Sequence, residues 1–302
     1  MIYLILVFEQ IFILIFFASI GYLLCHAGIL DGKSAKLLST LEVYVFLPAT
    51  VFRTFSKNFT VKYLAEKYYY IFVSIIVLCL VVLISHFIAK ALTKNHYNRN
   101  VYEYSIAIAN YGYMGYALTS AIFGEQMLLN LMMFAFPISI YIYTFGFCML
   151  TKSKISIKRL LNPMMIAILL GMLVGITGLE LPSVASEILN KGAACMSPVA
   201  MLLTGISLAA FKFTDLLRDK CYYIVTALRL VIMPLAICGA LKVLGLSDVI
   251  IPALMAYAMP CGLNTIVFPR LVGEKCEIGA GLAFISSILS LITLPIMVQI
   301  FA

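Results

Sequence analysis

Long apolar runs separated by short polar segments make up the whole chain. Each run has about 20 residues, the length a helix needs to cross the hydrocarbon core of a bilayer. The runs predict ten membrane-spanning helices, near residues 4–25, 34–54, 67–89, 101–123, 127–150, 162–178, 187–210, 221–244, 249–270 and 278–300. No connection exceeds about 15 residues, which leaves no room for a soluble domain. The function is therefore expected to lie within the membrane.

The composition agrees with this pattern. The chain is 64% hydrophobic and 11% charged, with a mean hydropathy of +1.08, and soluble domains are rarely more than half apolar. The first run has no Lys or Arg before it and no clear cleavage site, so it is predicted to be a retained helix and not a signal peptide. The eight cysteines are scattered without metal-site spacing, so we expect no disulfide framework, metal or other cofactor.

Basic residues are distributed unevenly between the loops. Loops after odd-numbered runs hold 14 Lys and Arg residues and loops after even-numbered runs hold 6. By the positive-inside rule the former are cytoplasmic. The sequence thus predicts a multi-pass protein of the cell (inner) membrane with both termini on the extracytoplasmic side. The net charge of +8 is explained by this pattern, and no nucleic-acid partner is expected. The loop after the second run is an exception, with Arg53, Lys57, Lys62 and Lys67.

The ninth run, Val249–Val272, is unusual for a membrane helix. It contains three prolines, including Pro260, together with Gly262 and Asn264. Proline removes a backbone donor and clashes with the preceding turn. Freed backbone groups are tolerated at membrane depth only where they line protein or water. We expect a broken helix beside a substrate site; the alternative is a kink that serves packing alone.

The fourth run has a similar centre, Asn110–Gly115, which is too polar and glycine-rich for a lipid-facing helix. If both runs break and cross, the amino-terminal ends of their half-helices would suit a carboxylate. The predicted substrate site consists of Asn110, Tyr111, Gly112, Tyr113, Met114, Gly115, Met259, Pro260, Cys261, Gly262 and Asn264. Each Tyr or Met has the alternative of facing lipid or filling the core.

Ten spans divide into two sets of five, residues 1–150 and 151–302. An odd number in each set gives the two sets opposite orientations, as in transporters built from inverted repeats. One offset of 150 residues pairs helix-interrupting residues of the two halves: Pro48 with Pro198, and Gly112 with Gly262. The alternative is coincidence, because two pairs are a small sample.

Ionisable residues within membrane spans are candidates for function. Glu42 and Arg229 both lie about 12 Å deep if each residue rises 1.5 Å. They are predicted to pair, or to act separately, with Arg229 attracting the substrate and Glu42 exchanging a proton; a static ion pair or a hydrated vestibule is the alternative. Glu103 and His86 lie near span ends and are expected to reach the membrane interface. The pattern from Gly171 to Gly175 is expected to pack closely, with a dimer interface as one assignment.

Several stretches together resemble the auxin efflux carrier family, which includes bacterial carriers and the plant PIN-FORMED proteins. They are FLPATVF at Phe46–Phe52, ANYGYMGYAL at Ala109–Leu118, LNPMMIAILLGMLVG at Leu161–Gly175, AMPCGLNTIVF at Ala258–Phe268 and SSILSLITLPI at Ser286–Ile296. The resemblance implies an all-α membrane protein of ten helices in two inverted repeats, akin to sodium/proton antiporters, with helices 4 and 9 crossed. It also implies a commonly dimeric scaffold from spans 1, 2, 6 and 7, and a mobile transport domain from spans 3–5 and 8–10.

The resemblance places the family's binding elements on Asn110, Gly112, Gly115, Pro260 and Asn264. Family members often have a proline in the fourth span where this chain has Ala117, so the break there is expected to rest on glycines alone or to be milder. The long insert of the plant proteins between spans 5 and 6 is absent, which favours a microbial short form.

We therefore expect a secondary transporter that moves a small organic anion, such as a malate-, malonate- or auxin-like acid, by alternating access. A sodium-coupled symporter of the bile-acid type is an alternative, although no acidic residue lies near either break. A membrane sensor without transport is a further alternative. An enzyme is disfavoured, because no zinc-protease, serine-hydrolase or nucleotide-binding motif occurs.

Overall fold

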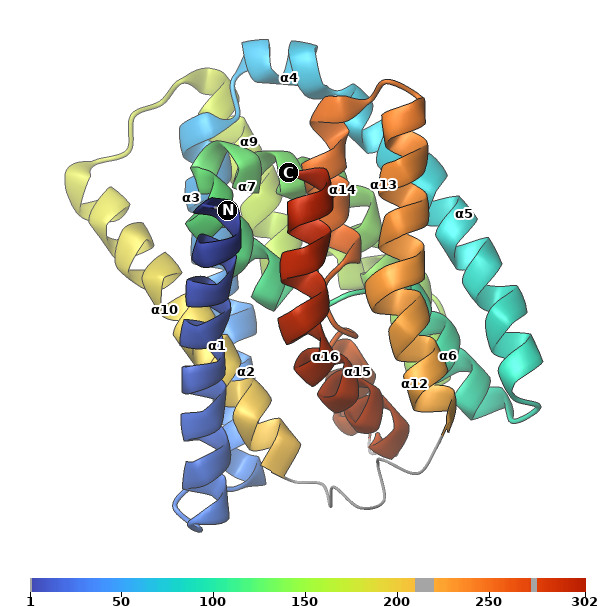
Figure 1. Ribbon diagram of the computed structural model, residues 1–302. Coiled ribbons are helices and arrows are strands. Elements are labelled where there is room, and N and C mark those ends of the chain that lie inside the picture. Colours follow the sequence, from blue (N-terminus) through green and yellow to red (C-terminus); the bar gives the residue numbers. More distant parts are fainter. Residues whose placement is uncertain (1, 210–219, 273–275) are drawn as a thin grey trace.

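The computed structural model describes residues 2–209, 220–272 and 276–302, and these are almost wholly helical (Figure 1). The first half contains α1 (Ile2–His26), α2 (Gly32–Leu41), η1 (Glu42–Phe46), α3 (Leu47–Asn58), α4 (Val61–Lys67), α5 (Tyr69–Leu92), α6 (His96–Ala107), η2 (Tyr111–Gly115), α7 (Tyr116–Tyr141), η3 (Ile142–Gly146) and α8 (Phe147–Thr151). The second contains η4 (Ile157–Leu160), α9 (Pro163–Thr177), α10 (Ser183–Ala209), α12 (Lys220–Ala227), η5 (Leu228–Ile232), α13 (Met233–Val243), α14 (Ser247–Tyr257), α15 (Asn264–Leu271) and α16 (Glu277–Phe301).

Local chemistry explains where several helices begin. Asp31 accepts hydrogen bonds from the Lys33 and Ser34 amides and caps α2. The backbone bond from Ser34 is the largest cause that holds the pKa of the Asp31 carboxyl below its ordinary value. Asn162 caps α9 through the Met165 amide at 3.0 Å, followed by proline in the first helical turn. The predicted start of this helix is confirmed.

Prolines also shape the interiors of long helices. The π-helical turn η1 precedes Pro48, and η5 precedes Pro234. A proline cannot donate to the preceding turn, and a wider turn accommodates the mismatch without ending the helix. The elements α2, η1 and α3 are therefore continuous over Gly32–Asn58, as are α12, η5 and α13 over Lys220–Val243.

By length and composition, six helical stretches in the described residues could cross a membrane: Phe8–His26, Lys33–Asn58, Tyr69–Leu92, Tyr111–Thr151, Lys220–Val243 and Glu277–Phe301. The fourth has 41 residues, but Gly124 interrupts it with φ 82° and ψ 178°. A left-handed φ favours glycine, and here it divides α7 where the sequence separates spans four and five. The all-helical membrane class is confirmed, whereas ten crossings in an inverted repeat stay a prediction.

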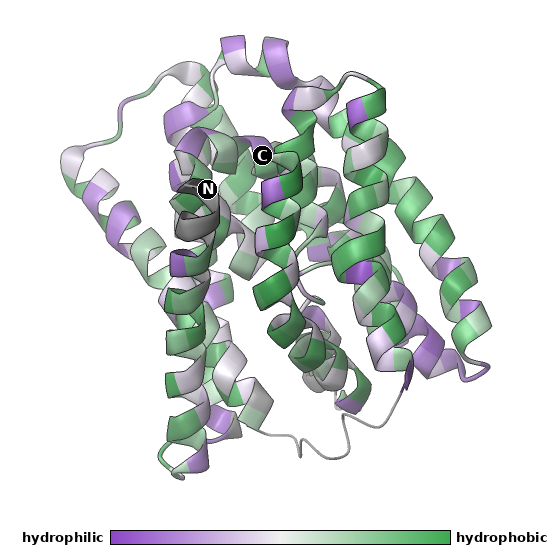
Figure 2. Cartoon of the chain, in the orientation of Figure 1, coloured by the Kyte–Doolittle hydropathy of each residue, from purple (hydrophilic) through white to green (hydrophobic). Residues whose placement is uncertain are grey.

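The surface has the polarity expected in lipid. Along α5, large apolar side chains such as Phe72 and Leu83 are exposed, whereas Ser74 and Ser85 are fully buried. Figure 2 shows α5 mostly hydrophobic along its length. With lipid outside, apolar side chains gain nothing from facing inward, and small residues allow helices to approach closely.

The helices pack in two groups. In the first group, α1 lies along α10, and α3 contacts both α9 and α10. The second group contains α5–α8 and α12–α16, in which α7 packs on α5 and α14, and α13 packs on α14. In Figure 1 the labels α1, α2, α3 and α10 lie to the left, and those of α5, α6, α12 and α13 to the right. The two groups meet where α3 and α1 contact α7, and where α10 contacts η2.

The close packing predicted for Gly171 and Gly175 is confirmed. A Cβ on Gly171 would lie 2.8 Å from the Phe55 Cβ, and one on Gly175 would lie 2.4 Å from the Phe59 carbonyl oxygen. The two glycines pack against α3 of the same chain, so their assignment to a dimer interface is wrong. A contact between Glu103 and His86 was not predicted.

His86 Nδ1 lies 2.9 Å from Glu103 Oε2. This contact joins α5 to α6, and the Glu103 side chain is only 10% exposed. The contact with His86 gives the partly buried Glu103 carboxylate a polar partner. The position of Glu103 near a helix end does not reveal this contact in the sequence.

Candidate functional site

The fourth span is interrupted, one turn earlier than predicted. Helix α6 ends at Ala107, and Ile108 is extended with φ −118° and ψ 124°. Asn110 has φ −81° and ψ 46°, after which the helical path resumes in η2 and α7. Of the predicted centre, Asn110–Gly115, only Asn110 belongs to the break, and Tyr111–Gly115 is a π-helical turn. The two half-helices of this span are α6 and the segment formed by η2 with the first part of α7.

The ninth span is interrupted where its second proline predicts. Helix α14 ends at Tyr257, and α15 begins at Asn264. The six residues between them, including Pro260, are non-helical. Pro252 and Pro269, by contrast, lie inside α14 and α15. Not every proline in this run ends a helix.

The two interruptions meet. Ala109 and Cys261 form an isolated antiparallel β-bridge, and the Asn110 amide donates to the Pro260 carbonyl oxygen at 2.8 Å. The Cys261 amide donates to Ser286 Oγ of α16 at 2.9 Å. Backbone groups freed by the breaks thereby find partners inside the protein, which their burial requires. We call residues 108–110 and 258–263 together the crossing.

Glycine enables the crossing by its size and not by its backbone freedom. A Cβ on Gly115 would lie 3.1 Å from the Met255 carbonyl oxygen, and one on Gly262 would lie 3.3 Å from the Ala109 carbonyl oxygen. Neither residue has a positive φ. These glycines therefore allow the two segments to come close without adopting a left-handed conformation.

Arg229 is fully buried beside the crossing, on η5. Its Nη1 donates to the Ile106 carbonyl oxygen at 3.0 Å, its Nη2 to Ala256 at 3.2 Å and its Nε to Met259 at 3.3 Å. Ile106 and Ala256 lie in the last turns of α6 and α14, where helices carry partial negative charge. The guanidinium therefore caps both carboxyl-terminal half-helix ends. The predicted pairing with Glu42 is wrong. Carbonyl groups at the two helix ends contact the guanidinium instead, and their partial charges cannot be read from the sequence.

Glu42 lies elsewhere, at the start of η1. Its side chain is fully buried, and neither carboxylate oxygen has a hydrogen-bond partner in the described structure. The element that carries it, η1, packs on α2, α3, α9 and α10. Glu42 therefore lies within the first helix group, without a cation.

A small cavity of about 40 Å³ lies against the crossing. The second helix group contributes most of its wall, and Leu47 of α3 and Met164 of α9 contribute from the first group. This volume has room for a few water molecules. A larger solute would fit only if the two groups moved apart.

Six predicted residues line this cavity: Asn110, Tyr111, Gly112, Tyr113, Gly262 and Asn264. Asn110 and Met114 also line a second, more apolar cavity of about 410 Å³ beside α1, α10 and α16. The other predicted residues are buried and line neither cavity. Met259, Pro260 and Cys261 belong to the crossing, and Gly115 lies beside it in η2.

Several polar partners were not predicted. Asn264 Nδ2 donates to the Tyr104 hydroxyl at 3.0 Å, and the Tyr111 hydroxyl lies 2.9 Å from Ser139 Oγ. Tyr104 precedes the first break by one turn, and Ser139 lies in the next span, so no local pattern marks them as site residues. Ser286 does fall in a stretch that carries the family resemblance, which was the available signal.

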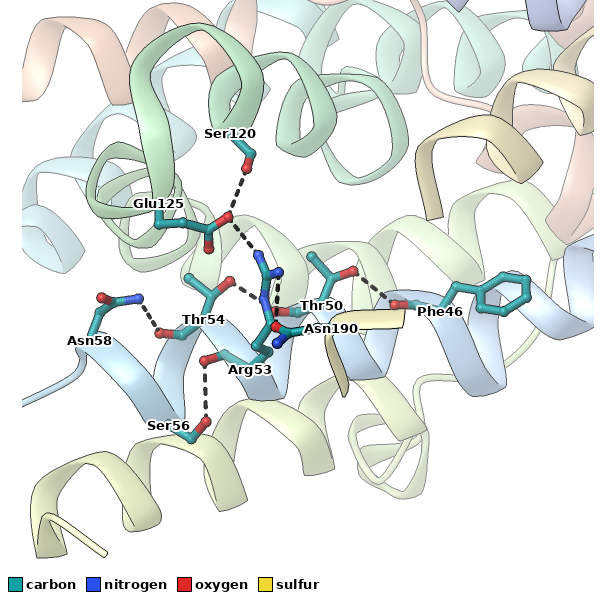
Figure 3. A network of polar contacts seen from close by, with 9 residues as sticks. All are labelled: Phe46, Thr50, Arg53, Thr54, Ser56, Asn58, Ser120, Glu125 and Asn190. Atoms are coloured by element: carbon teal, nitrogen blue, oxygen red, sulfur yellow. Dashed lines mark hydrogen bonds and ion pairs between the residues drawn. The ribbon is translucent and has the colours of Figure 1, made fainter. Parts of the chain in front are cut away.

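A polar network joins the two helix groups away from the crossing (Figure 3). Arg53 Nη2 of α3 lies 2.5 Å from Glu125 Oε1 of α7, and Arg53 Nη1 lies 3.4 Å from Asn190 Oδ1 of α10. Ser120 Oγ donates to the same carboxylate oxygen at 2.9 Å. Glu125 follows the interruption at Gly124, so the network links the first group to the turn between spans four and five.

This chain is similar to known membrane transport proteins. The family model described as "Membrane transport protein" matches residues 6–158 and 147–298. An uncharacterized transporter from Methanothermobacter thermautotrophicus is 24% identical over 299 residues, which cover 95% of this chain and 96% of the relative. An uncharacterized transporter from Methanocaldococcus jannaschii is 27% identical over 120 residues, 39% of each chain. Because the family matches cover nearly the whole chain, this protein belongs to the membrane transport protein family of the auxin efflux carrier type.

Proposed function

We propose that this protein is a secondary active transporter that moves a small organic anion across the membrane by alternating access. One observation carries the choice of an anion. Arg229 covers the two negative half-helix ends at the crossing, on α6 and α14, while the cavity is lined by the residues that begin η2 and α15. First-turn N–H groups have no partner within their own helix and carry partial positive charge.

The surrounding charges favour the same conclusion. Arg229 forms no ion pair within 4.0 Å with a carboxylate of the described residues; its positive charge faces carbonyl dipoles and the Tyr257 ring. In a low-dielectric interior an unpaired cation attracts anions over many ångströms. Asn110 and Asn264 add uncharged donors and acceptors at the cavity wall. A carboxylate is the ligand that best complements this set.

Alternating access follows from where the cavity lies. Its walls come from both helix groups, so relative movement of the groups would open it. In the proposal, α1, α2–α3, α9 and α10 form the scaffold and the remaining helices move with the crossing. The interrupted spans would be equivalent members of two inverted repeats, residues 1–150 and 151–302. The protein would be a homodimer in the cell membrane with both termini outside.

Flux into liposomes tests the proposal. Purified protein is reconstituted and exchange of malonate, malate and succinate is measured with and without sodium, after a thermal-shift screen of the same acids. We expect exchange of at least one acid, and a smaller thermal shift for that acid in Asn264→Ala. Asn98→Ala, on α6 away from the crossing, is the matched control. Binding without exchange would instead indicate a sensor, and exchange that requires sodium would indicate the sodium-coupled alternative.

A further inference from the structure

The described residues include two buried acids with different surroundings. Glu103, with 8% exposure, has His86 as its partner. Glu42, with 0% exposure, has no hydrogen-bond partner for either oxygen. An ionised carboxylate without a cation beside it is strongly disfavoured in a protein interior within the membrane. The burial of Glu42 therefore favours the neutral acid.

The position of Glu42 places it next to the proposed substrate path. It begins η1 of the first helix group, and η1 packs on α2, α3, α9 and α10. Leu47, which directly follows η1, lines the cavity at the crossing. Glu42 therefore lies close in the chain to the part of the cavity wall that the first helix group contributes.

Among the described residues, no charged neighbour forms an ion pair with Glu42. The charged residues on the packed elements are Lys33 and Lys36 on α2, Arg53 and Lys57 on α3, and Glu187 and Lys191 on α10; α9 has none. None of them forms an ion pair with Glu42 in the described structure. Arg53 pairs with Glu125 and Lys191 pairs with Glu187, while Lys33, Lys36 and Lys57 are exposed. Tyr113 and the exposed Cys195 thiol are the other titratable groups on these surfaces.

We propose that Glu42 is a proton-binding site that couples anion transport to proton symport; this rests on the transport function proposed above. When the cavity opens to water, hydration permits Glu42 to ionise. An anion beside a carboxylate is repelled, so the anion and a proton bind together, and each increases the affinity of the other by the same factor. The proton moves from water on one side onto the Glu42 carboxylate, and returns to water on the other side when the cavity reopens.

Calorimetry gives the first test. The member of the malonate, malate and succinate panel with the largest thermal shift is titrated into wild-type protein in buffers of different ionisation enthalpy. We expect uptake of up to one proton per anion in wild type and none in Glu42→Gln, which has nearly the same shape. Glu9→Gln, an exposed acid on α1, should behave as wild type. Wild-type binding without proton uptake would overturn the proposal, whether or not the variant folds.

Driven accumulation gives the second test. With the membrane potential clamped at zero, a 1:1 symporter should accumulate the acid about tenfold for each unit of pH difference, the factor by which the proton concentration differs. Glu42→Gln should retain exchange but lose this accumulation, and Glu9→Gln should keep both. Accumulation that survives in Glu42→Gln overturns the proton site alone. Absence of exchange in wild type overturns the transport function on which it rests.

Discussion

The Asn110 amide donates a 2.8 Å hydrogen bond to the Pro260 carbonyl oxygen, across 150 residues of sequence. This bond lies next to the bridge between Ala109 and Cys261. It joins two interrupted helices that each leave backbone groups unpaired. Each break therefore supplies a hydrogen-bond partner to the other, and a substitution that disrupts one break should also affect the other.

Gly115 is predicted to tolerate no larger side chain. Its Cβ position lies 3.1 Å from the Met255 carbonyl oxygen, and overpacking a buried site costs about 1–3 kcal/mol. Gly115→Val should therefore unfold at a lower temperature in detergent and lose anion exchange. Gly239→Ala on α13 is the control, because nothing lies within 4 Å of its Cβ position. Equal thermal stability of the two variants would contradict close approach at Gly115.

Arg229→Met should be among the most destabilising substitutions in the chain. Three carbonyl oxygens would lose their donor, and removing one member of a buried charged network costs about 3–5 kcal/mol. Arg229→Lys should recover part of the loss, because it keeps the charge but offers one nitrogen for three acceptors. Thermal unfolding measures both effects.

Lys242→Met, an exposed basic residue on α13, is the matched control for loss of a charge. Anion binding provides a second measurement. If Arg229→Lys binds the panel acids as wild type while Arg229→Met remains folded and binds them equally well, the positive charge is not part of anion attraction.

The contact between Arg53 and Glu125 should influence the relative movement of the two helix groups more than the stability of the fold. The two side chains are 24% and 38% exposed, and such pairs contribute about 0.2–1 kcal/mol. Glu125→Gln should change the exchange rate by up to about fivefold, the factor that 1 kcal/mol represents, with little change in unfolding temperature. The charge reversal of both residues should restore the rate.

The exposed pair Lys62 and Glu66 within α4 is the control for this experiment. Glu66→Gln removes a similar ion pair that joins no two groups, and it should leave exchange unchanged. A double charge reversal that behaves as the sum of its single changes would show that Arg53 and Glu125 do not act as a pair.

Tyr104→Phe should weaken anion binding without removing a cavity-lining residue. The Tyr104 hydroxyl accepts from Asn264 Nδ2 at 3.0 Å and so orients the amide. Loss of a neutral hydrogen bond costs about 0.5–1.5 kcal/mol, which corresponds to a roughly two- to tenfold higher dissociation constant. Titration calorimetry with the panel acids checks this, and unchanged affinity would assign Tyr104 to packing alone.

The sequence was informative wherever the physics is local. Apolar runs locate the helices because a span must be continuous in sequence, and Asn162 with Pro163 marks a helix start because both act within one turn. Pro260 locates the second break. The first break lies one turn before its predicted position. No proline marks it, and glycine content does not show which residue leaves the helix.

By itself, the sequence determined that this is a helical membrane protein of a transporter family, with interruptions in two of its spans. The tertiary structure decided which interruptions meet, that Arg229 caps two helix ends in place of pairing with Glu42, and that Glu42 has no partner. Arg229 and the Ile106 carbonyl oxygen are 123 residues apart. Contacts of this kind depend on how distant helices pack, because a buried charge or backbone group is satisfied by whatever donor or acceptor the fold brings within about 3 Å.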